Sequence, residues 1–354
     1  MDFAFSDEQL MSADVARKLL TEHCTPASLR RLMTAGLAHD ERTWQELSQI
    51  GLTGLLLPES LGGLGLGETD FVLIAEACGY AALPGPFVEH TGVAGPLLAA
   101  AGVGTAREEL ARRAGAGEVL LAIGHPSNPF VADADIAAAV LMEHRNEIHL
   151  VLPHAARLTR QESIDPFRRL FRVDWTPSPD TQLTSGAPGK PLWEEAFNRG
   201  ALFAAAQCLG LAQRAVDLSV EYVKTRKQFG KAIGSYQAMK HLLASVQVKI
   251  EFARPVVYAA AARFAQRNLF SRALISHAKL VASEAAEAGA RAALQTHGAM
   301  GYSWEVDVHL LLKRALALEC AWGLPSFHRE RVMHRILTQP LGPEHTFSCE
   351  PHHA

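Results

Sequence analysis

The chain has 354 residues, of which 48% are hydrophobic and 20% charged, and its formal net charge is -3. The chain is longer than a usual domain with a single hydrophobic core, so we expect two or three packed units. Because the net charge is near neutral, we do not expect nucleic acid or an anionic membrane as a binding partner. No apolar run is long enough to predict a membrane span. The first ten residues carry acidic and no basic side chains, so no signal peptide is expected.

The cysteines are far apart in the sequence and form no C-x-x-C pair: Cys24, Cys78, Cys208, Cys320 and Cys349. We interpret them as reduced, mostly buried thiols of a cytoplasmic protein. The C-terminal tail also contains His345, His352 and His353, but their spacing matches no recognisable metal site. We therefore expect a frayed polar terminus and no metal.

The first 117 residues are predicted to form an N-terminal helical domain. Ser6 and Gln9 have the spacing of a capping box, which marks a helix start. Two further apolar-periodic segments predict helices over 68–82 and 93–102. The glycine-rich run at 61–67 lacks a Gly-Lys-Ser/Thr signature and a preceding strand, which favours a connector over a phosphate loop.

A small middle β-domain is predicted over 118–184. Its short apolar runs are separated by glycine, proline and charged residues, a pattern typical of strands. The predicted strands cover 118–124, 136–143, 147–153 and 170–177.

Helical periodicity returns in the last domain, 185–354. One apolar stripe contains Met239, Leu242, Leu243, Val246, Ile250 and Ala253, and a second contains Val308, Leu311, Leu312 and Ala315. We therefore predict an α+β fold, mostly α, whose C-terminal part is a helical bundle.

The stretch RKQFGKAIGSYQ, which begins at Arg226, is the first candidate site. Gly230 and Gly234 allow a sharp turn after a helix that ends at the arginine. A guanidinium at such a corner can hold a diphosphate through paired hydrogen bonds. Phe229 offers a flat apolar surface, and Gln237 lies at the next helix start, which also favours anions. Spacing alone leaves two interpretations, a cofactor-binding turn and an ordinary capped turn.

The second candidate cluster is LQTHGAMGYSWEVDV, which begins at Leu294. Gln295 and Gly298 place an amide and an accessible backbone beside a turn. His297 is a conceivable general base, but a histidine next to a glycine turn is more often a hydrogen-bonded structural residue. No Ser-His-Asp arrangement or G-x-S-x-G motif is recognised in the sequence.

Together the two clusters resemble the acyl-CoA dehydrogenase family. Its pattern is R-x-Q-F-G-x-x-I-x-x-F/Y-Q, followed further along the chain by Q-x-x-G-G-x-G-Y/F. The first part is matched by Arg226, Gln228, Phe229, Gly230, Ile233, Tyr236 and Gln237, and the second by Gln295, Gly298, Gly301 and Tyr302. The segments FSDEQL and IGLTGLLLPE near the start also fit, so the resemblance extends over nearly the whole chain.

The resemblance implies an N-terminal helical domain, a middle β-domain, a C-terminal four-helix bundle and the cofactor FAD. In the family a glutamate takes the α-proton of an acyl-CoA while the flavin accepts the β-hydride. The arginine loop reaches across a dimer interface to the pyrophosphate and adenosine half of the neighbour's FAD. The cofactor-binding residues implied here are Arg226, Gln228, Phe229, Ile233, Gln237, Gln295, Gly298 and Ala299, the last of which replaces a family glycine.

The sequence departs from the family at the catalytic positions. The two family positions for the base fall on Trp322 and Gly200, neither of which can accept a proton, so no catalytic residue is predicted. The T-E-P-x-x-G-S-D-like and W-I-T-like stretches that serve the flavin ring are missing. A displaced base among Glu194, Glu195 and Glu319 is the alternative, and surface or capping roles are the simpler interpretation for these glutamates.

With these departures the chain resembles the short, degenerate subunit of heterotetrameric (α2β2) bacterial acyl-CoA dehydrogenases. Those enzymes act on CoA thioesters from steroid degradation. The implied partner is a homologous catalytic subunit that supplies the base and the flavin-ring site. A widened acyl pocket for a bulky steroid-like chain is a further expectation by analogy. A self-sufficient homo-oligomer with a displaced glutamate and a non-enzymatic scaffold remain the alternatives.

Overall fold

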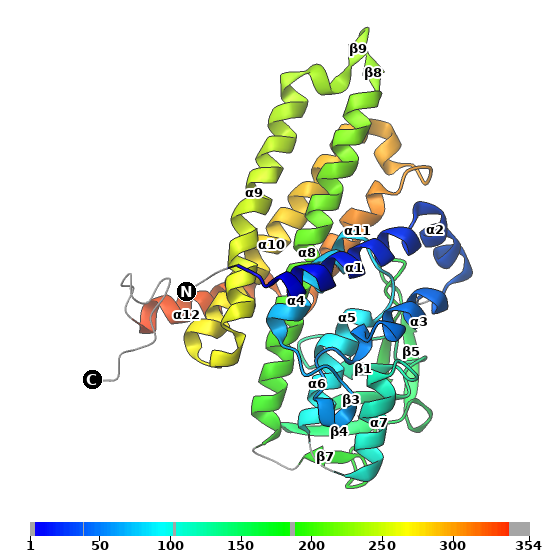
Figure 1. Ribbon diagram of the computed structural model, residues 1–354, viewed down its shortest axis with the longest axis vertical. Coiled ribbons are helices and arrows are strands. Elements are labelled where there is room, and N and C mark those ends of the chain that lie inside the picture. Colours follow the sequence, from blue (N-terminus) through cyan, green and yellow to red (C-terminus); the bar gives the residue numbers. More distant parts are fainter. Residues whose placement is uncertain (1–3, 38, 102–103, 185–187, 340–354) are drawn as a thin grey trace.

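The computed structural model describes residues 4–37, 39–101, 104–184 and 188–339. Helices of the N-terminal part and two small sheets lie along one side of the lower part of a long helical bundle, and a hairpin projects from the far end of the bundle (Figure 1). The N-terminal helices are α1 (Asp7–His23), α2 (Pro26–Ala35), α3 (Glu41–Gln49), α4 (Glu68–Tyr80), α5 (Phe87–Glu89), α6 (Gly95–Ala100) and α7 (Thr105–Gly115). Shorter helical turns are η1 (Leu52–Gly54), η2 (Glu59–Leu61) and the π-helical η3 (His90–Ala94).

The predicted capping box starts α1. The Ser6 N–H donates to Gln9 Oε1 at 3.0 Å, and the Gln9 N–H donates to Ser6 Oγ at 3.2 Å. The glycine-rich run at 61–67 is a packed connector, because the backbone N–H groups of 63–66 donate to carbonyls of residues 54–58. Its amides are therefore occupied within the chain, and the connector interpretation is confirmed.

Two small sheets form the middle of the chain. Their strands are β1 (Leu121–Gly124), β2 (Val131–Ala132), β3 (Ala139–His144), β4 (Glu147–Val151), β5 (Arg157–Gln161), β6 (Leu170–Asp174) and β7 (Gln182–Thr184). The first sheet has the order β1-β3-β4-β7, with β1 and β3 parallel, and the second has the order β2-β6-β5. Each predicted strand is present in shorter form. The sequence missed β2, β5 and β7, and β5 shows the reason: this polar edge strand buries none of its residues.

The C-terminal bundle consists of long helices. They are α8 (Gly189–Thr225), α9 (Gln237–Ala262), α10 (Leu269–His297), α11 (Val308–Cys320) and α12 (Pro325–Thr338). A two-stranded hairpin, β8 (Lys227–Gln228) with β9 (Lys231–Ala232), and the turn η5 (Ile233–Ser235) join α8 to α9. The turn η6 (Phe264–Gln266) precedes α10, and η7 (Gly298–Tyr302) follows it. The predicted stripes face the core through Leu243, Val246, Ile250 and Ala253 on α9, and through Val308, Leu311 and Ala315 on α11.

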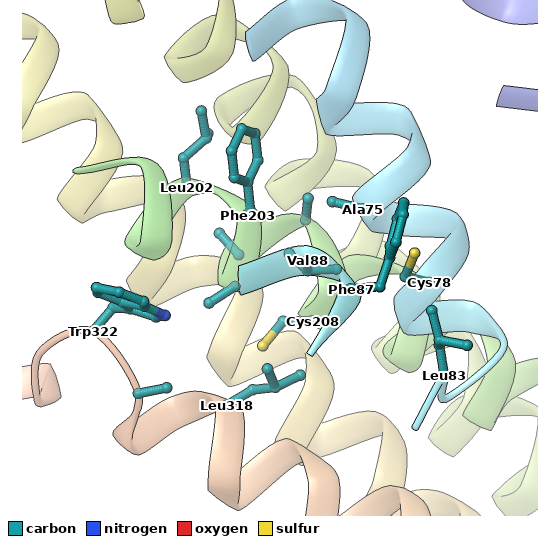
Figure 2. Close-up of a cluster of buried hydrophobic side chains, with 14 of the residues drawn as sticks. Ala75, Cys78, Leu83, Phe87, Val88, Leu202, Phe203, Cys208, Leu318 and Trp322 are labelled. Atoms are coloured by element: carbon teal, nitrogen blue, oxygen red, sulfur yellow. The ribbon is translucent and has the colours of Figure 1, made fainter. Parts of the chain in front are cut away.

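Close packing of α4 on α8 joins the N-terminal helices to the bundle. A Cβ atom added at Gly79 would lie 1.9 Å from the Gln207 carbonyl oxygen, and one at Gly210 would lie 1.9 Å from the Glu76 carbonyl oxygen. The two helix backbones therefore touch, as only glycine permits. The aromatic side chain of Phe203 is part of the buried cluster beside this contact, which extends to Trp322 at its other end (Figure 2).

Candidate functional site

A tight hairpin places the RKQFG motif at the outer end of the bundle (Figure 1). Arg226 ends α8, and its backbone N–H donates to the Tyr222 carbonyl at 2.9 Å. Phe229 and Gly230 form the two-residue turn, with φ of 52° and 81°. Positive φ at both positions matches the twist of a two-stranded ribbon. The Ile233 N–H closes the base of the hairpin by donating to the Arg226 carbonyl at 2.8 Å.

The side chains of the hairpin are directed mainly to solvent. Phe229 is 92% exposed, and Arg226, Gln228 and Gln237 are also exposed, whereas Ile233 packs partly against the core. Within the described part of the chain, the Arg226 guanidinium has no carboxylate or hydrogen-bonding partner. An unpaired guanidinium keeps its full set of donors, so it is available to an anion that approaches from outside the chain.

The second cluster lies against the base of the hairpin. The rings of Tyr222, one turn before Arg226, and His297 stack with their centroids 4.1 Å apart. His297 is 7% exposed and its Nδ1 lies 2.7 Å from the Ala293 carbonyl oxygen. Burial lowers the pKa of His297 below its ordinary value. His297 is therefore a buried, hydrogen-bonded residue that joins the two clusters, as the structural interpretation of the sequence expected.

Three further predicted site residues are exposed beside this stack. Gln295, Gly298 and Ala299 lie at the junction of α10 and η7. Gly298 has φ of 60°, and a Cβ atom added there would meet nothing within 4 Å. The backbone at this turn is therefore open to direct approach by a ligand.

Gly200 and Trp322, the two positions to which the family resemblance assigns the base, are in contact in the structure. A Cβ atom added at Gly200 would lie 2.1 Å from Cδ2 of the Trp322 indole. Trp322 is 2% exposed, and its side chain lies at the edge of the buried cluster drawn in Figure 2. Its backbone N–H donates to Asn128 Oδ1 at 2.8 Å, and its carbonyl oxygen lies 3.0 Å from His328 Nε2. These contacts hold the indole over the Gly200 backbone, and neither position offers a proton acceptor.

A small cavity lies beside Trp322. It has a volume of about 10 Å³ and is lined by β1, Glu89, Asn128, Phe130 and Arg168, among others. A space of this size holds at most about one water molecule. This cavity is too small for an acyl chain, because the indole and the neighbouring side chains occupy the space, and the expectation of a widened acyl pocket stays a prediction.

Two of the three glutamates considered as displaced bases have other contacts. An oxygen of the Glu194 carboxylate lies 2.8 Å from Arg272 Nη2. Glu195 Oε1 accepts from Arg199 at 2.5 Å and from Arg267 at 3.0 Å. A carboxylate that already accepts charge-assisted hydrogen bonds has fewer lone pairs free to take a proton from a substrate. For Glu194 and Glu195 these contacts favour the structural role.

Asp133, which follows the end of β2, is a buried carboxyl group that no motif of the sequence indicates. It is 2% exposed, has φ of 53°, and its Oδ1 has no hydrogen-bond partner within the described chain. Burial, followed by the neighbouring Glu89 carboxylate, raises the pKa of Asp133 from 3.8 to about 8. The native state therefore keeps a proton that the unfolded chain releases at lower pH.

Asp133→Asn is expected to stabilise the chain more at high pH than at low pH. Because the unfolded chain binds fewer protons than the native state between the two pKa values, stability falls as pH rises through this window. We expect the gain in free energy of unfolding to be about 4 kcal/mol larger near pH 8.5 than near pH 5. Denaturant titrations at both pH values measure it, with the exposed Asp180→Asn as control. An equal effect at both pH values would contradict the assignment.

Among the described residues, no cluster of three or more His, Cys, Asp or Glu side chains has the arrangement of a metal site, and no helix is long and apolar enough to cross a membrane. Cys78 and Cys208 are buried, Cys24 is half-buried and Cys320 is exposed. Cys349 and the histidines of the tail lie outside the described residues.

The arrangement of N-terminal helices, two small sheets and a C-terminal bundle with a basic hairpin defines an acyl-CoA dehydrogenase fold. Residues 6–118 match the acyl-CoA dehydrogenase N-terminal domain, and residues 188–337 match the acyl-CoA dehydrogenase C-terminal domain. The chain belongs to the acyl-CoA dehydrogenase family, a family of oxidoreductases.

Similar proteins agree with this assignment. The acyl-CoA dehydrogenase IpdE2 of Mycobacterium tuberculosis is 34% identical over 311 residues, which cover 87% of this chain and 91% of the relative. A chain in the crystal structure of the ChsE4-ChsE5 complex from Mycobacterium tuberculosis has a TM-score of 0.84 at 22% identity and covers 96% of this chain and 100% of that one. The Tcur3481-Tcur3483 steroid ACAD G363A variant has a TM-score of 0.82 at 22% identity, with coverage of 94% and 98%.

Proposed function

We propose that this chain is one subunit of an FAD-dependent acyl-CoA dehydrogenase and supplies the adenosine and pyrophosphate half of a shared FAD site. One observation carries the proposal. The Trp322 indole packs on Gly200, and the family resemblance assigns the base to these two positions, whereas the Arg226 hairpin is exposed. A chain with an open nucleotide-binding face and a filled catalytic position fits a site that two subunits complete together.

The predicted cofactor-binding residues of the two clusters fit the nucleotide half of FAD. Arg226 would hold the pyrophosphate, and the open backbone at Gly298 allows close approach. Gln228, Phe229, Ile233 and Gln237 would line this half, with Gln295 and Ala299 on the adenosine side. FAD supplies the hydride acceptor of the dehydrogenation. The residues of this chain bind and orient the nucleotide, and we assign the proton acceptor to the partner.

We infer that the partner is a homologous catalytic subunit, in an α2β2 assembly in the cytoplasm, and that the substrate is an acyl-CoA of the steroid class. Two of the similar structures, ChsE4-ChsE5 and Tcur3481-Tcur3483, are named as pairs of proteins, and the second is called a steroid ACAD. We also infer that residues 1–117, 118–184 and 185–354 are the three domains. The supporting observation is that the strands of the two sheets lie between Leu121 and Thr184.

The proposal is tested by measuring flavin with and without the partner. The chain is purified alone and after co-expression with a homologous subunit that contains the glutamate base, and bound FAD is measured by its absorbance. We expect no stoichiometric FAD on the chain alone, and FAD together with acyl-CoA dehydrogenase activity in the complex. Stoichiometric FAD and activity in the isolated chain would overturn the proposal, and absence of flavin from every complex would favour a scaffold.

A second arm tests for a base in this chain. Glu194→Gln and Glu319→Gln are introduced into the complex, and turnover is compared with that after replacement of the partner's glutamate. We expect turnover to persist in the first two variants and to be lost in the third, because the proton acceptor belongs to the partner. Loss of turnover with Glu194→Gln or Glu319→Gln, in a complex that still holds FAD, would favour the displaced-base alternative.

A further inference from the structure

A second cavity lies between the N-terminal helices and the bundle. Its volume is about 350 Å³, and it is bounded by α1, α2, the end of α4, α8 and the start of α11. None of the eight residues proposed for FAD lines it. This size falls within the range of small-molecule sites, which are mostly apolar with a few placed polar groups.

The walls of this cavity are mainly apolar. They include Leu20 on α1, Leu29 on α2, Leu218 on α8 and Leu311 on α11, together with Phe167 from the loop before β6. Leu20, Leu29, Phe167 and Leu311 are buried. Side chains that border an open space lack dispersion contacts on one side, so an apolar occupant of matching shape gains them on binding.

One cation of the cavity lining has no carboxylate partner. Arg30 pairs with Asp307, its Nε lying 2.9 Å from Oδ1, and Arg314 pairs with Asp165. Arg214 forms no ion pair with any described residue. Its guanidinium carbon lies 5.3 Å from the centroid of the Tyr80 ring.

Two groups lie next to Arg214, the Tyr80 hydroxyl and the Asp217 carboxylate one turn further along α8, and neither forms an ion pair with it within the described chain. The Tyr80 hydroxyl donates to Asp217 Oδ2 at 2.8 Å, and Gln213 Nε2 donates to the other oxygen of that carboxylate at 2.9 Å. The Glu305 carboxylate belongs to the lining and forms no ion pair within the described chain, but it is exposed, so water screens its charge. An anionic group on an apolar ligand therefore finds its complementary charge at Arg214.

We propose that this cavity binds a small amphipathic carboxylate, an apolar chain of medium length lying along α1, α2 and α11 with its carboxylate at Arg214. The ligand binds without covalent attachment. Cys24 is in the wall, but burial raises the pKa of its thiol to about 12, so the nucleophilic thiolate is scarce. The inference is independent of the FAD proposal, because it concerns other residues and a ligand that the isolated chain binds.

Decanoate and 1-decanol are the probes, titrated calorimetrically into the full-length chain. Decanoate is expected to bind once per chain and about tenfold more tightly than the alcohol, because a hydrogen bond to a charged group adds affinity of that order. Arg214→Met is expected to reduce decanoate affinity about tenfold and to leave decanol binding unchanged. Arg112→Met, on α7 and outside the cavity, serves as the matched control.

A second variant fills the cavity. Ala81 lies in the wall at the end of α4 and is half-buried, so Ala81→Phe is expected to abolish binding of both probes while circular dichroism shows the native helix content. The proposal is overturned by absence of saturable decanoate binding to the unmodified chain. It is also overturned by equal affinity for the two probes, or by unchanged binding in the folded Ala81→Phe variant.

Discussion

Arg226→Ala is expected to weaken retention of FAD by the complex at least about tenfold while the subunit stays folded. The guanidinium is exposed and has no partner within the described chain, so its removal breaks no internal contact. Hydrogen bonds between a charged donor and a phosphate contribute about 1.5–3 kcal/mol, and two are formed in a bidentate contact. Dialysis of the complex followed by flavin absorbance measures the change.

Lys224→Ala provides the matched control for this experiment. Lys224 is also an exposed cation at the end of α8, but its Nζ is 2.9 Å from Glu221 Oε1. Flavin retention is expected to be unaffected by its loss. Arg226→Lys should restore only part of the retention, because an ammonium cannot reproduce the planar pair of donors. If Arg226→Ala leaves flavin occupancy unchanged, this side chain does not hold the pyrophosphate.

Asp165→Asn is expected to lower the free energy of unfolding by about 3–5 kcal/mol, the cost of leaving one buried charge unpaired. Asp165 is 1% exposed and accepts from Nε of the buried Arg314. Arg314 Nη1 also donates to the Leu83 carbonyl at 2.9 Å. The pair thus joins the loop before β6 to α11 and to the segment after α4, and denaturant unfolding measures its contribution.

Two comparisons separate this effect from ordinary loss of charge. Glu118→Gln removes an exposed ion pair with Arg113, and such pairs contribute about 0–1 kcal/mol. The double variant Asp165→Leu with Arg314→Met replaces both buried charges, so it should be less damaging than the single change. A loss below about 1 kcal/mol for Asp165→Asn would show that the Arg314 charge is stabilised by other groups.

Much of the fold was predictable from local patterns. The capping box at Ser6 and the apolar stripe on α9 both occur as predicted, because neighbouring residues decide them. The strand β5 was missed because an edge strand receives its hydrogen bonds from a partner while its side chains stay polar. Its pairing with β6 depends on residues outside its own segment.

The site was predicted in part. Residues of the two clusters were identified by motif, and their exposure agrees with the proposed role, but their function remains a prediction. The raised pKa of Asp133 and the lone charge of Arg214 had no signal in the sequence. Both features depend on what lies around a side chain, and the residues around them come from distant segments of the chain.

By itself the sequence determined that the chain has acyl-CoA dehydrogenase motifs and lacks a glutamate at both family base positions, since residue identity and spacing decide these points. Only the tertiary structure showed that Trp322 and Gly200 meet and that the indole fills the space between them. The physical reason is packing. The two residues are far apart in sequence and come into contact because α8 lies against the segment after α11. The volume left between them depends on every side chain around it.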